Sequence, residues 1–521
     1  MRLLAVFATL LAVAAVSGRL MTMQEMNEGR LEAAKRWQTG GSQNGKSGGV
    51  QNFTFTNPKA SEFYVDGKSL PLVDFDVGPS WAGLLPISNS PNETRQLFFW
   101  FFPPGPQGSL DDLIFWTNGG PGCSSLAGLL EENGASLFVD DKTSITEMFE
   151  ALYLVLGWTN LSSVLWVEQP VGTGFSQGIP DAQNEDDVAV QVVGFMQQFL
   201  EVFSELKGKK LYLSGESYAG RYVPCESAVI FFERNSKTNE DIANYIYENP
   251  TLLDLSLQGI WINDPLFSWF VVQQEIPAWD FVKKHASLFS FDQTYMEQLD
   301  AMAAMCNYTG YMDKYVTYPP KGLLPLPGDS INFVQGCDIW TDIYFNALMI
   351  NPSFNIYRIW DTYPLPWDVL GLLDTQSPIY FNLTDVKEAI HAPVNTDWFI
   401  CKPDVFETGD GSLPPAFTVL PNVIEKSQRT VIVHGLADFM LIAAGDRIVI
   451  QNMTWNGLQG FQTPIANDSF MIDGVGAYGS MHSERGLTYY EVALSGHMVP
   501  QFAPVASFQI MQYLMGFRDT P

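Results

Sequence analysis

Short apolar segments that alternate with longer segments of helical periodicity constrain the fold of this chain most strongly. Each short segment is rich in aromatic or β-branched residues and is bounded by turn residues, which is typical of a buried strand. A helical pattern over residues 185–206 lies between two of them. Because buried strands that alternate with helices form parallel sheets, we predict an α/β fold with a mostly parallel sheet. The expected strands are residues 97–102, 113–117, 163–168, 210–214, 257–262, 430–435 and 487–493.

The length of 521 residues, 46% of them hydrophobic, allows two domains or one domain with large insertions. The globular part is expected to cover residues 53–521. Between Pro265 and about residue 390 the alternation gives way to segments rich in proline and aromatic residues. We therefore expect residues 265–390 to form an insertion that caps the sheet.

The N-terminal residues predict export. Residues 1–18 combine one Arg, an apolar stretch and a small-residue end, as in a cleaved secretory signal. Residues 19–52 are polar and Gly-rich, so they are interpreted as a flexible leader or processed segment. Residues 40–47 match a phosphate-binding pattern, but neither a strand before them nor a helix after them is expected, so a nucleotide site is rejected. No later segment predicts a membrane span or anchor.

The net charge and the glycosylation sequons indicate which partners this chain can have. A formal net charge of −29 argues against nucleic acid, because phosphate binding needs a basic surface. The acidity suits an acidic milieu, and equally it could carry no functional meaning. Seven N-x-S/T sequons predict N-linked glycans and a secretory route. They are Asn52, Asn92, Asn160, Asn307, Asn382, Asn452 and Asn467.

The chain has five cysteines. In an oxidising compartment this number suggests two disulfides and one unpaired thiol. Spacing alone leaves the connectivity open.

Serines flanked by glycines occur at residues 45–49, 174–178 and 215–220. The first lies in the polar leader, and the second is followed closely by Pro180, which disfavours a helix start. Only Ser217 has an expected strand before it and an expected helix after it. A serine on such a tight turn is exposed above the sheet edge, where it can act as a nucleophile. We predict that Ser217 is the nucleophile.

A nucleophilic serine needs a base, and only five histidines are available. His497 follows the last expected strand, as a base at the sheet edge should. His434 could be a packed core histidine, and His285, His391 and His482 suit surface or structural roles. The orienting acid should lie between the serine and the base, in the loop after the penultimate strand. Asp438 lies there, whereas its competitor Asp446 lies one or two helical turns further on.

Two amide groups are expected to bind the oxyanion. One is the N–H of Tyr218, next to the nucleophile. The other is the N–H of Gly120, in the Gly-rich loop after the strand at 113–117, where glycines let the backbone approach a substrate. For this loop alone, a plain Gly-Pro turn would be a sufficient explanation.

Four motifs together resemble the serine carboxypeptidases, which are secreted or vacuolar enzymes of the α/β-hydrolase fold. The resemblance covers most of the chain from about residue 53. It implies helices on both faces of the sheet, a cap, and removal of single residues from peptide C-termini at acidic pH without metal or other cofactor. The same fold also serves acyltransferases. The motifs are WTNGGPGCSSLAGLLEENG at 116–134, EQPVGTGFS at 168–176, GESYAGRY at 215–222 and GHMVP at 496–500.

The resemblance also implies a site for the substrate's terminal carboxylate. Asn118 and the amide of Gly119 would donate to it, beside the paired carboxyls of Glu132 and Glu216. Carboxyls that face a third one repel unless protons are shared, so this group should have a raised pKa. We expect acidic conditions to favour a free C-terminus and higher pH to favour amides or esters. Glu131 is expected on a solvated helix face.

For the cysteines, the resemblance implies a Cys123–Cys401 bridge. Proximity suggests Cys306 with Cys337, which would leave Cys225 free. The chain departs from the family pattern at Leu436, where an additional Asp is common, and in the segment 439–447, which lacks a Cys-Asn pair. Preference for the penultimate side chain is therefore left open.

Other functions remain as alternatives. An esterase, lipase or acyltransferase could use the same three residues, and a secreted binding protein could keep the fold without catalysis. A zinc peptidase is disfavoured, because no H-E-x-x-H pattern exists and the histidines are scattered. The expected destination is extracellular, with a vacuole or lysosome-like compartment as the alternative.

Overall fold

The computed structural model describes residues 55–73, 75–105, 108–134, 156–224, 253–327, 336–361 and 379–521. Several expectations concern residues outside these ranges. They are the signal segment, the leader with its phosphate-binding pattern, Asn52 and Cys225.

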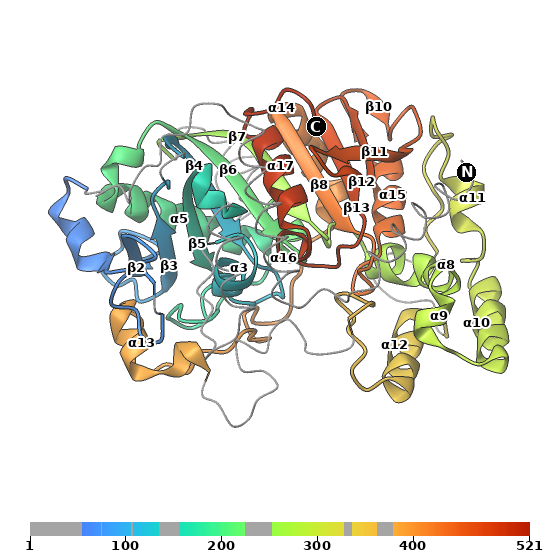
Figure 1. Ribbon diagram of the computed structural model, residues 1–521, viewed down its shortest axis with the longest axis horizontal. Coiled ribbons are helices and arrows are strands. Elements are labelled where there is room, and N and C mark those ends of the chain that lie inside the picture. Colours follow the sequence, from blue (N-terminus) through green and yellow to red (C-terminus); the bar gives the residue numbers. More distant parts are fainter. Residues whose placement is uncertain are drawn as a thin grey trace, which may run out of the picture.

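An eleven-stranded sheet forms the centre of the protein (Figure 1). Its six central strands run in the order β5-β4-β6-β7-β8-β13 and are parallel, while antiparallel strands extend it on both sides. All seven expected strands are present, and the α/β-hydrolase type of fold is confirmed. The strands of this sheet are β1 (Tyr64–Val65), β2 (Ser80–Pro86), β3 (Gln96–Phe102), β4 (Ser109–Thr117), β5 (Ser162–Glu168), β6 (Lys209–Glu216), β7 (Leu255–Asn263), β8 (Arg429–Gly435), β11 (Ala466–Ile472), β12 (Gly476–Glu484) and β13 (Leu487–Val492), and β9 (Thr454–Trp455) with β10 (Leu458–Gln459) forms a separate hairpin.

The sheet is buried on both faces because its strands are apolar at successive positions. In β4, Leu113 and Phe115 face one apolar cluster, while Ile114 and Trp116 face the other. Helix α5 (Glu185–Val202) packs in the first cluster. Helices α3 (Ser125–Glu131) and α17 (Pro504–Leu514) pack in the second. A strand buried on both faces reads as a continuous apolar run, which is why the sequence predicted these strands well.

The helical pattern at 185–206 forms α5 with a short 3₁₀ turn, Ser204–Leu206, after it. The side-chain oxygen of Asn184 accepts hydrogen bonds from the N–H groups of Asp186 and Asp187, which caps the start of the helix. The acidic residues of the first turn complement the positive end of the helix dipole.

The segment expected to form one cap contributes to two separate regions. Helices α8 to α12 gather at one end of the sheet, on the right in Figure 1. Helix α13 (Thr384–Ala389) lies at the opposite end, and His391 after it contacts the carbonyl oxygen of Ala82 in β2 at 3.2 Å. The other bounds are α8 (Ile276–Lys284), α9 (Ala286–Phe289), α10 (Gln293–Met305), α11 (Tyr311–Tyr315) and α12 (Ile339–Ile350).

Two disulfides are present. Cys306–Cys337 joins the end of α10 to the residues just before α12, and Cys123–Cys401 joins the Gly-rich loop after β4 to the segment that follows α13. Both pairs are those expected above.

Within the described ranges, no helix combines the length and apolar character that crossing a bilayer would require.

Candidate active site

Ser217 follows β6 directly and has a φ of 60°, in the left-handed region. Its N–H donates to the carbonyl oxygen of Asn263 at 2.9 Å, and its own carbonyl accepts from Leu266 at 2.8 Å. The glycines of the motif allow this close packing: a Cβ on Gly215 would lie 2.5 Å from the Thr117 carbonyl, and one on Gly220 would lie 2.6 Å from Pro265. Helix α6 (Ala219–Tyr222) starts at once. Hydrogen bonds to the end of the neighbouring strand β7 and to the residues after it stabilise this strained conformation of Ser217.

The serine of the competing motif has a structural role. Ser176 is buried, donates its hydroxyl to the carbonyl of Glu168 and accepts from the N–H of Phe98. No helix follows it before α5.

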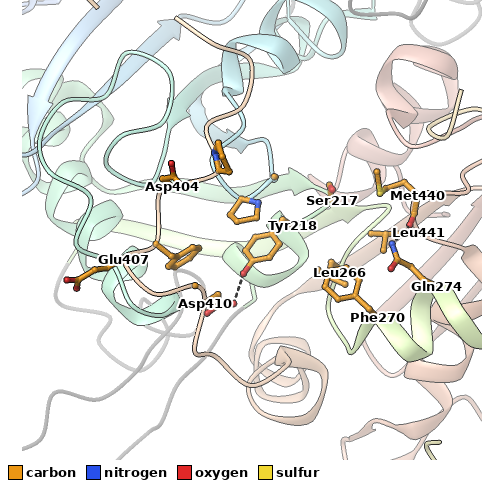
Figure 2. A pocket seen from close by; sticks show the side chains of 15 residues that line it. Ser217, Tyr218, Leu266, Phe270, Gln274, Asp404, Glu407, Asp410, Met440 and Leu441 are labelled. Atoms are coloured by element: carbon orange, nitrogen blue, oxygen red, sulfur yellow. Dashed lines mark hydrogen bonds between the residues drawn. The ribbon is translucent and has the colours of Figure 1, made fainter. Parts of the chain in front are cut away.

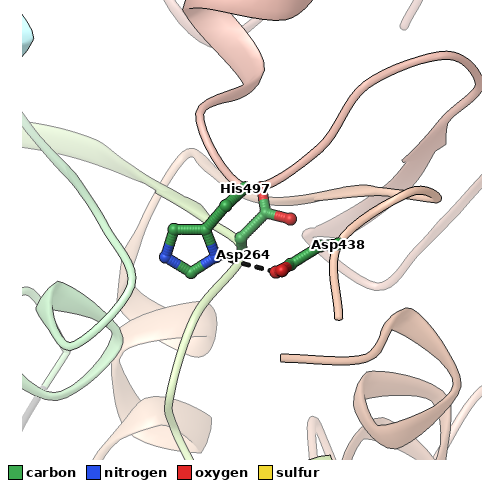
Figure 3. A group of neighbouring side chains, drawn as sticks. All are labelled: Asp264, Asp438 and His497. Carbon is green, nitrogen blue, oxygen red and sulfur yellow. Dashed lines mark hydrogen bonds and ion pairs between the residues drawn. The ribbon is translucent and has the colours of Figure 1, made fainter. Parts of the chain in front are cut away.

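His497 and Asp438 are paired through Nδ1 and Oδ2 at 2.7 Å (Figure 3). They lie in the loops after the parallel neighbours β13 and β8, and these loops are joined by a hydrogen bond from the N–H of Ala437 to the carbonyl of Ser495. The carboxylate of Asp438 also accepts from the N–H groups of Met440 at 2.8 Å and Leu441 at 3.3 Å. Asp438 is therefore fixed in orientation.

Asn263, the last residue of β7, links the two halves of the site. Its backbone carbonyl accepts from the N–H of Ser217, and its side-chain amide donates to the carbonyl oxygen of His497 at 3.2 Å. The nucleophile candidate and the base candidate thus both contact one residue at one edge of the sheet. These contacts link the backbone of Ser217 to the His497–Asp438 pair through Asn263, and the catalytic roles of the three residues are proposed below.

His497 and Asp438 each stabilise the charged form of the other. Burial acts to lower the pKa of His497, but Asp438 outweighs it and raises that pKa to about 9. Burial acts to raise the pKa of Asp438, but His497 and His434 hold it below its usual value. Asp438 is therefore ionised, as an orienting carboxylate must be.

Asp264 lies beside the same pair, and one oxygen or nitrogen atom from each of the three side chains lies within 4.8 Å of the others (Figure 3). Such a set could ligate a cation. Here the nitrogen of His497 and the oxygen of Asp438 face each other in a hydrogen bond instead.

The amides expected to bind an oxyanion lie in adjoining loops. A Cβ on Gly119 would lie only 2.3 Å from the backbone nitrogen of Tyr218, so the two backbones touch and only glycine fits there. Gly120 has a φ of 111°, which also requires glycine. Within the described part of the chain, neither the N–H of Gly120 nor that of Tyr218 donates to another backbone group. Both remain available for a substrate oxygen.

Asn118, Glu132 and Glu216 form a buried cluster. The side-chain amide of Asn118 donates to Glu132 at 3.0 Å and to Glu216 at 2.8 Å, while its oxygen accepts from Trp116 and Gly128. Burial, and then the charge of Glu216, raise the pKa of Glu132 well above its usual value. Burial also raises the pKa of Glu216. The cluster therefore holds protons more tightly than ordinary carboxyls do.

Glu131 does not lie on a solvated helix face, contrary to expectation. It is 5% exposed, and burial followed by the charge of Glu216 raises its pKa well above the usual value. The reason is that α3 is short and is covered on several sides, with six of its seven residues buried.

Ser217 and Tyr218 line a pocket of about 510 Å³ (Figure 2). One side is apolar, with Leu266, Phe270 and Met440, and the other carries carboxylates. The hydroxyl of Tyr218 donates to Asp410 at 2.5 Å. No sequence signal marked the acidic residues of the lining, because they come from a segment without a motif; they are Asp404, Glu407 and Asp410.

The structure also tests the surroundings of the other candidate residues. His434 is fully buried, as a core histidine would be, and Asp446 contacts it rather than His497. Asn92, Asn307 and Asn467 are exposed, and Asn160 and Asn382 are half-buried. Asn452 is buried, and its side-chain oxygen accepts a hydrogen bond from the N–H of Leu324.

Comparisons with known proteins agree with this geometry. The model of the serine carboxypeptidase family matches residues 73–516. A probable serine carboxypeptidase of Arthroderma benhamiae is 40% identical over 89% of this chain and 88% of that protein, and the serine-type carboxypeptidase F of Aspergillus niger is 38% identical over 90% of each. The crystal structure of a prohormone-processing carboxypeptidase from Saccharomyces cerevisiae shares the fold, with a TM-score of 0.65 at 21% identity over 88% of this chain and 97% of that one. The chain belongs to the serine carboxypeptidase family.

Proposed function

We propose that this enzyme releases single amino acids from the C-termini of peptides and proteins at acidic pH, through an acyl-enzyme on Ser217. One observation carries the proposal: Glu216, which belongs to the buried carboxyl cluster with Asn118, directly precedes the strained Ser217. A nucleophile beside a cluster that can share protons with an anionic group suits a substrate that ends in a carboxylate.

In the proposed mechanism, the hydroxyl oxygen of Ser217 attacks the last peptide carbonyl and His497 takes its proton. The N–H groups of Gly120 and Tyr218 bind the negative oxygen that forms. His497 then gives the proton to the leaving amine, which departs as the free amino acid. Water, deprotonated by His497, hydrolyses the ester and restores the hydroxyl. Asp438 orients the imidazole throughout.

The C-terminal carboxylate would bind at the amide groups of Asn118 and Gly119, next to Glu132 and Glu216. When either carboxyl is protonated it donates a hydrogen bond to the carboxylate, whereas an ionised pair repels it. The raised pKa values of Glu132 and Glu216 keep these protons at acidic pH. The raised pKa of His497 works in the opposite direction, because the base must be neutral. At acidic pH the carboxyl cluster is protonated while only a small fraction of His497 is neutral, so efficiency should follow a bell-shaped pH profile that both titrations set.

We also propose that the protein passes through the secretory route and acts outside the cell, with a vacuole or lysosome-like compartment as the alternative destination. The two disulfides support an oxidising compartment. Fractionation of cells that express the full chain would separate the two destinations, and recovery of the enzyme in the cytosol would contradict both.

An N-blocked dipeptide with a free C-terminus, incubated at about pH 4–5, tests the function directly. We expect release of the C-terminal amino acid, measured by chromatography, and a loss of at least about 10³-fold in the Ser217→Ala variant. The matching dipeptide amide should be cleaved much less well at that pH. Efficient cleavage of a simple ester without release of amino acids would favour an esterase or acyltransferase instead.

A further inference from the structure

A second histidine lies behind the catalytic pair. His434, at the end of β8, is fully buried, and both of its ring nitrogens have partners. Nδ1 lies 2.6 Å from Oδ2 of Asp446 in α15 (Ala443–Asn452), and Nε2 lies 2.9 Å from the carbonyl oxygen of Leu441. The same Nε2 lies 3.4 Å from Asp264 and 3.5 Å from Asp438.

The partners of His434 fix its protons. The carbonyl of Leu441 can only accept, so Nε2 carries a hydrogen. The other oxygen of Asp446 accepts from the side-chain amide of Gln273 at 2.9 Å, and the same amide donates to the carbonyl of Pro265. The oxygen of Gln273 accepts from two backbone N–H groups, so this amide cannot be reversed. One further proton therefore lies between Asp446 and Nδ1 of His434.

Burial raises the pKa of Asp446, but the hydrogen bond from Gln273 and the charges around His434 favour a carboxylate beside an imidazolium. Three carboxylates face His434 from three different elements: Asp446 from α15, Asp264 after β7 and Asp438 after β8. Burial acts to lower the pKa of His434, but Asp446 and Asp264 outweigh it and raise it well above the usual value. The other charged groups near this set are His497 beside Asp438, Glu216 beyond His497, and the Glu491–Arg447 pair beyond Asp446.

His434 also reaches Asp438 through the backbone. Its Nε2–H holds the carbonyl of Leu441, and the N–H of the same residue donates to Asp438. The loop that cradles the carboxylate of Asp438 is therefore anchored on His434 at its far end.

We propose that His434, as a buried imidazolium held by Asp446, is a positioning residue for the reaction: it fixes the loop around Asp438 and supplies a positive charge that keeps the Asp438–His497 pair competent as the medium becomes acidic. The inference rests on the roles proposed above for Asp438 and His497. It adds a residue that touches neither the substrate nor the reacting atoms.

The Asp446→Asn variant separates charge from geometry. The introduced side-chain amide can accept from Gln273 with its oxygen and donate to Nδ1 of His434 with its nitrogen, so every hydrogen bond is kept while His434 becomes neutral. The variant removes both charges of the His434–Asp446 ion pair. Because the imidazole faces Asp438 while Asp446 lies on its other side, the loss of the positive charge dominates and the pKa of the Asp438–His497 pair rises. We expect the acidic limb of kcat/KM to move upward by about one pH unit, with about a tenfold loss on that limb, little change at the plateau and an unchanged KM. An acidic limb that stays in place would overturn the proposal.

A second measurement does not depend on activity. In ¹⁵N-histidine NMR of the whole enzyme, the signal that disappears in His434→Gln should keep imidazolium shifts at about pH 7–8. Neutral shifts for that signal would overturn the proposal as well. If the wild-type enzyme released no amino acid while the signal stayed that of an imidazolium, the proposed function would fail and the state of His434 would stand.

Discussion

At the scale of single residues, local signals were enough to predict the turn at Ser217 but not the groups behind it. A strand, a glycine-flanked serine and a helix follow one another within a few residues, so the turn can be predicted from the sequence. The network around His434 joins Asp264 to Asp446, which are far apart in the chain. That pairing depends on the strand order β7-β8-β13, which no local pattern encodes. The burial of Glu131 was missed for the same reason.

The carboxyl cluster leads to a prediction about Glu216. As the pH rises and the cluster ionises, its charge should repel the substrate's carboxylate and raise KM for free-acid peptides. In Glu216→Gln one charge is removed, so KM should rise less with pH than it does in the wild-type enzyme. At a pH where the cluster is ionised, the two KM values should differ by about tenfold. Steady-state kinetics across the pH range would measure it. Peptide amides provide the control, since their KM should change little; a variant with the wild-type KM profile would contradict the assignment.

At the scale of elements, the fully buried strands were predicted, whereas the strands at the edges of the sheet and the division of the segment 265–390 were not. The expected strands are apolar at nearly every position, whereas β12 has only one buried residue among nine and shows no clear alternation. Helices α8, α10 and α12 pack against one another, and α13 lies at the opposite end of the sheet. A break in composition at 265–390 showed where the alternation stops but could not show that the segment divides.

The Cys306–Cys337 bridge should stabilise this helical region mainly. It closes a separation of 31 residues, for which the chain-entropy estimate is about 3–4 kcal/mol. We expect the Cys306→Ser, Cys337→Ser double variant to be cut by proteases between α10 and α12 and to lose thermal stability. Limited proteolysis and calorimetry would measure this.

The matched control is Cys123→Ser with Cys401→Ser. That bridge holds the loop with Gly119 and Gly120, so its loss should lower kcat as well as stability. Equal effects of the two double variants on kcat would contradict this division of roles.

At the scale of the whole molecule, buried carboxyls and a large negative charge both make the folded protein less stable as the pH rises. Burial raises the pKa of Glu168 to about 7 and that of Glu275 to about 8. Glu275 accepts from the N–H groups of Ile339 and Trp340 at the start of α12. In the unfolded chain both groups would titrate near 4.5. The folded protein therefore binds more protons than the unfolded chain between these values.

The free energy of unfolding should accordingly fall as the pH rises from about 4.5 to about 8. For Glu168 alone the loss is about 3 kcal/mol, and repulsion among the net −29 charges adds to it. Thermal unfolding followed from about pH 4.5 to about 8 should show a steady decrease in Tm. In Glu275→Gln, whose amide oxygen can still accept at the start of α12, the decrease should be smaller. A Tm that rises toward neutral pH would contradict this account.

Strand β7 contributes no reacting group, yet its end residue Asn263 is held between the segments that carry Ser217 and His497. It therefore links the backbone of the proposed nucleophile to that of the proposed base. Engineering of this enzyme can exchange the loops that line the pocket. A one-residue insertion or deletion in β7, by contrast, would shift Ser217 relative to His497. Strand β7 should therefore be left unchanged when the enzyme is redesigned.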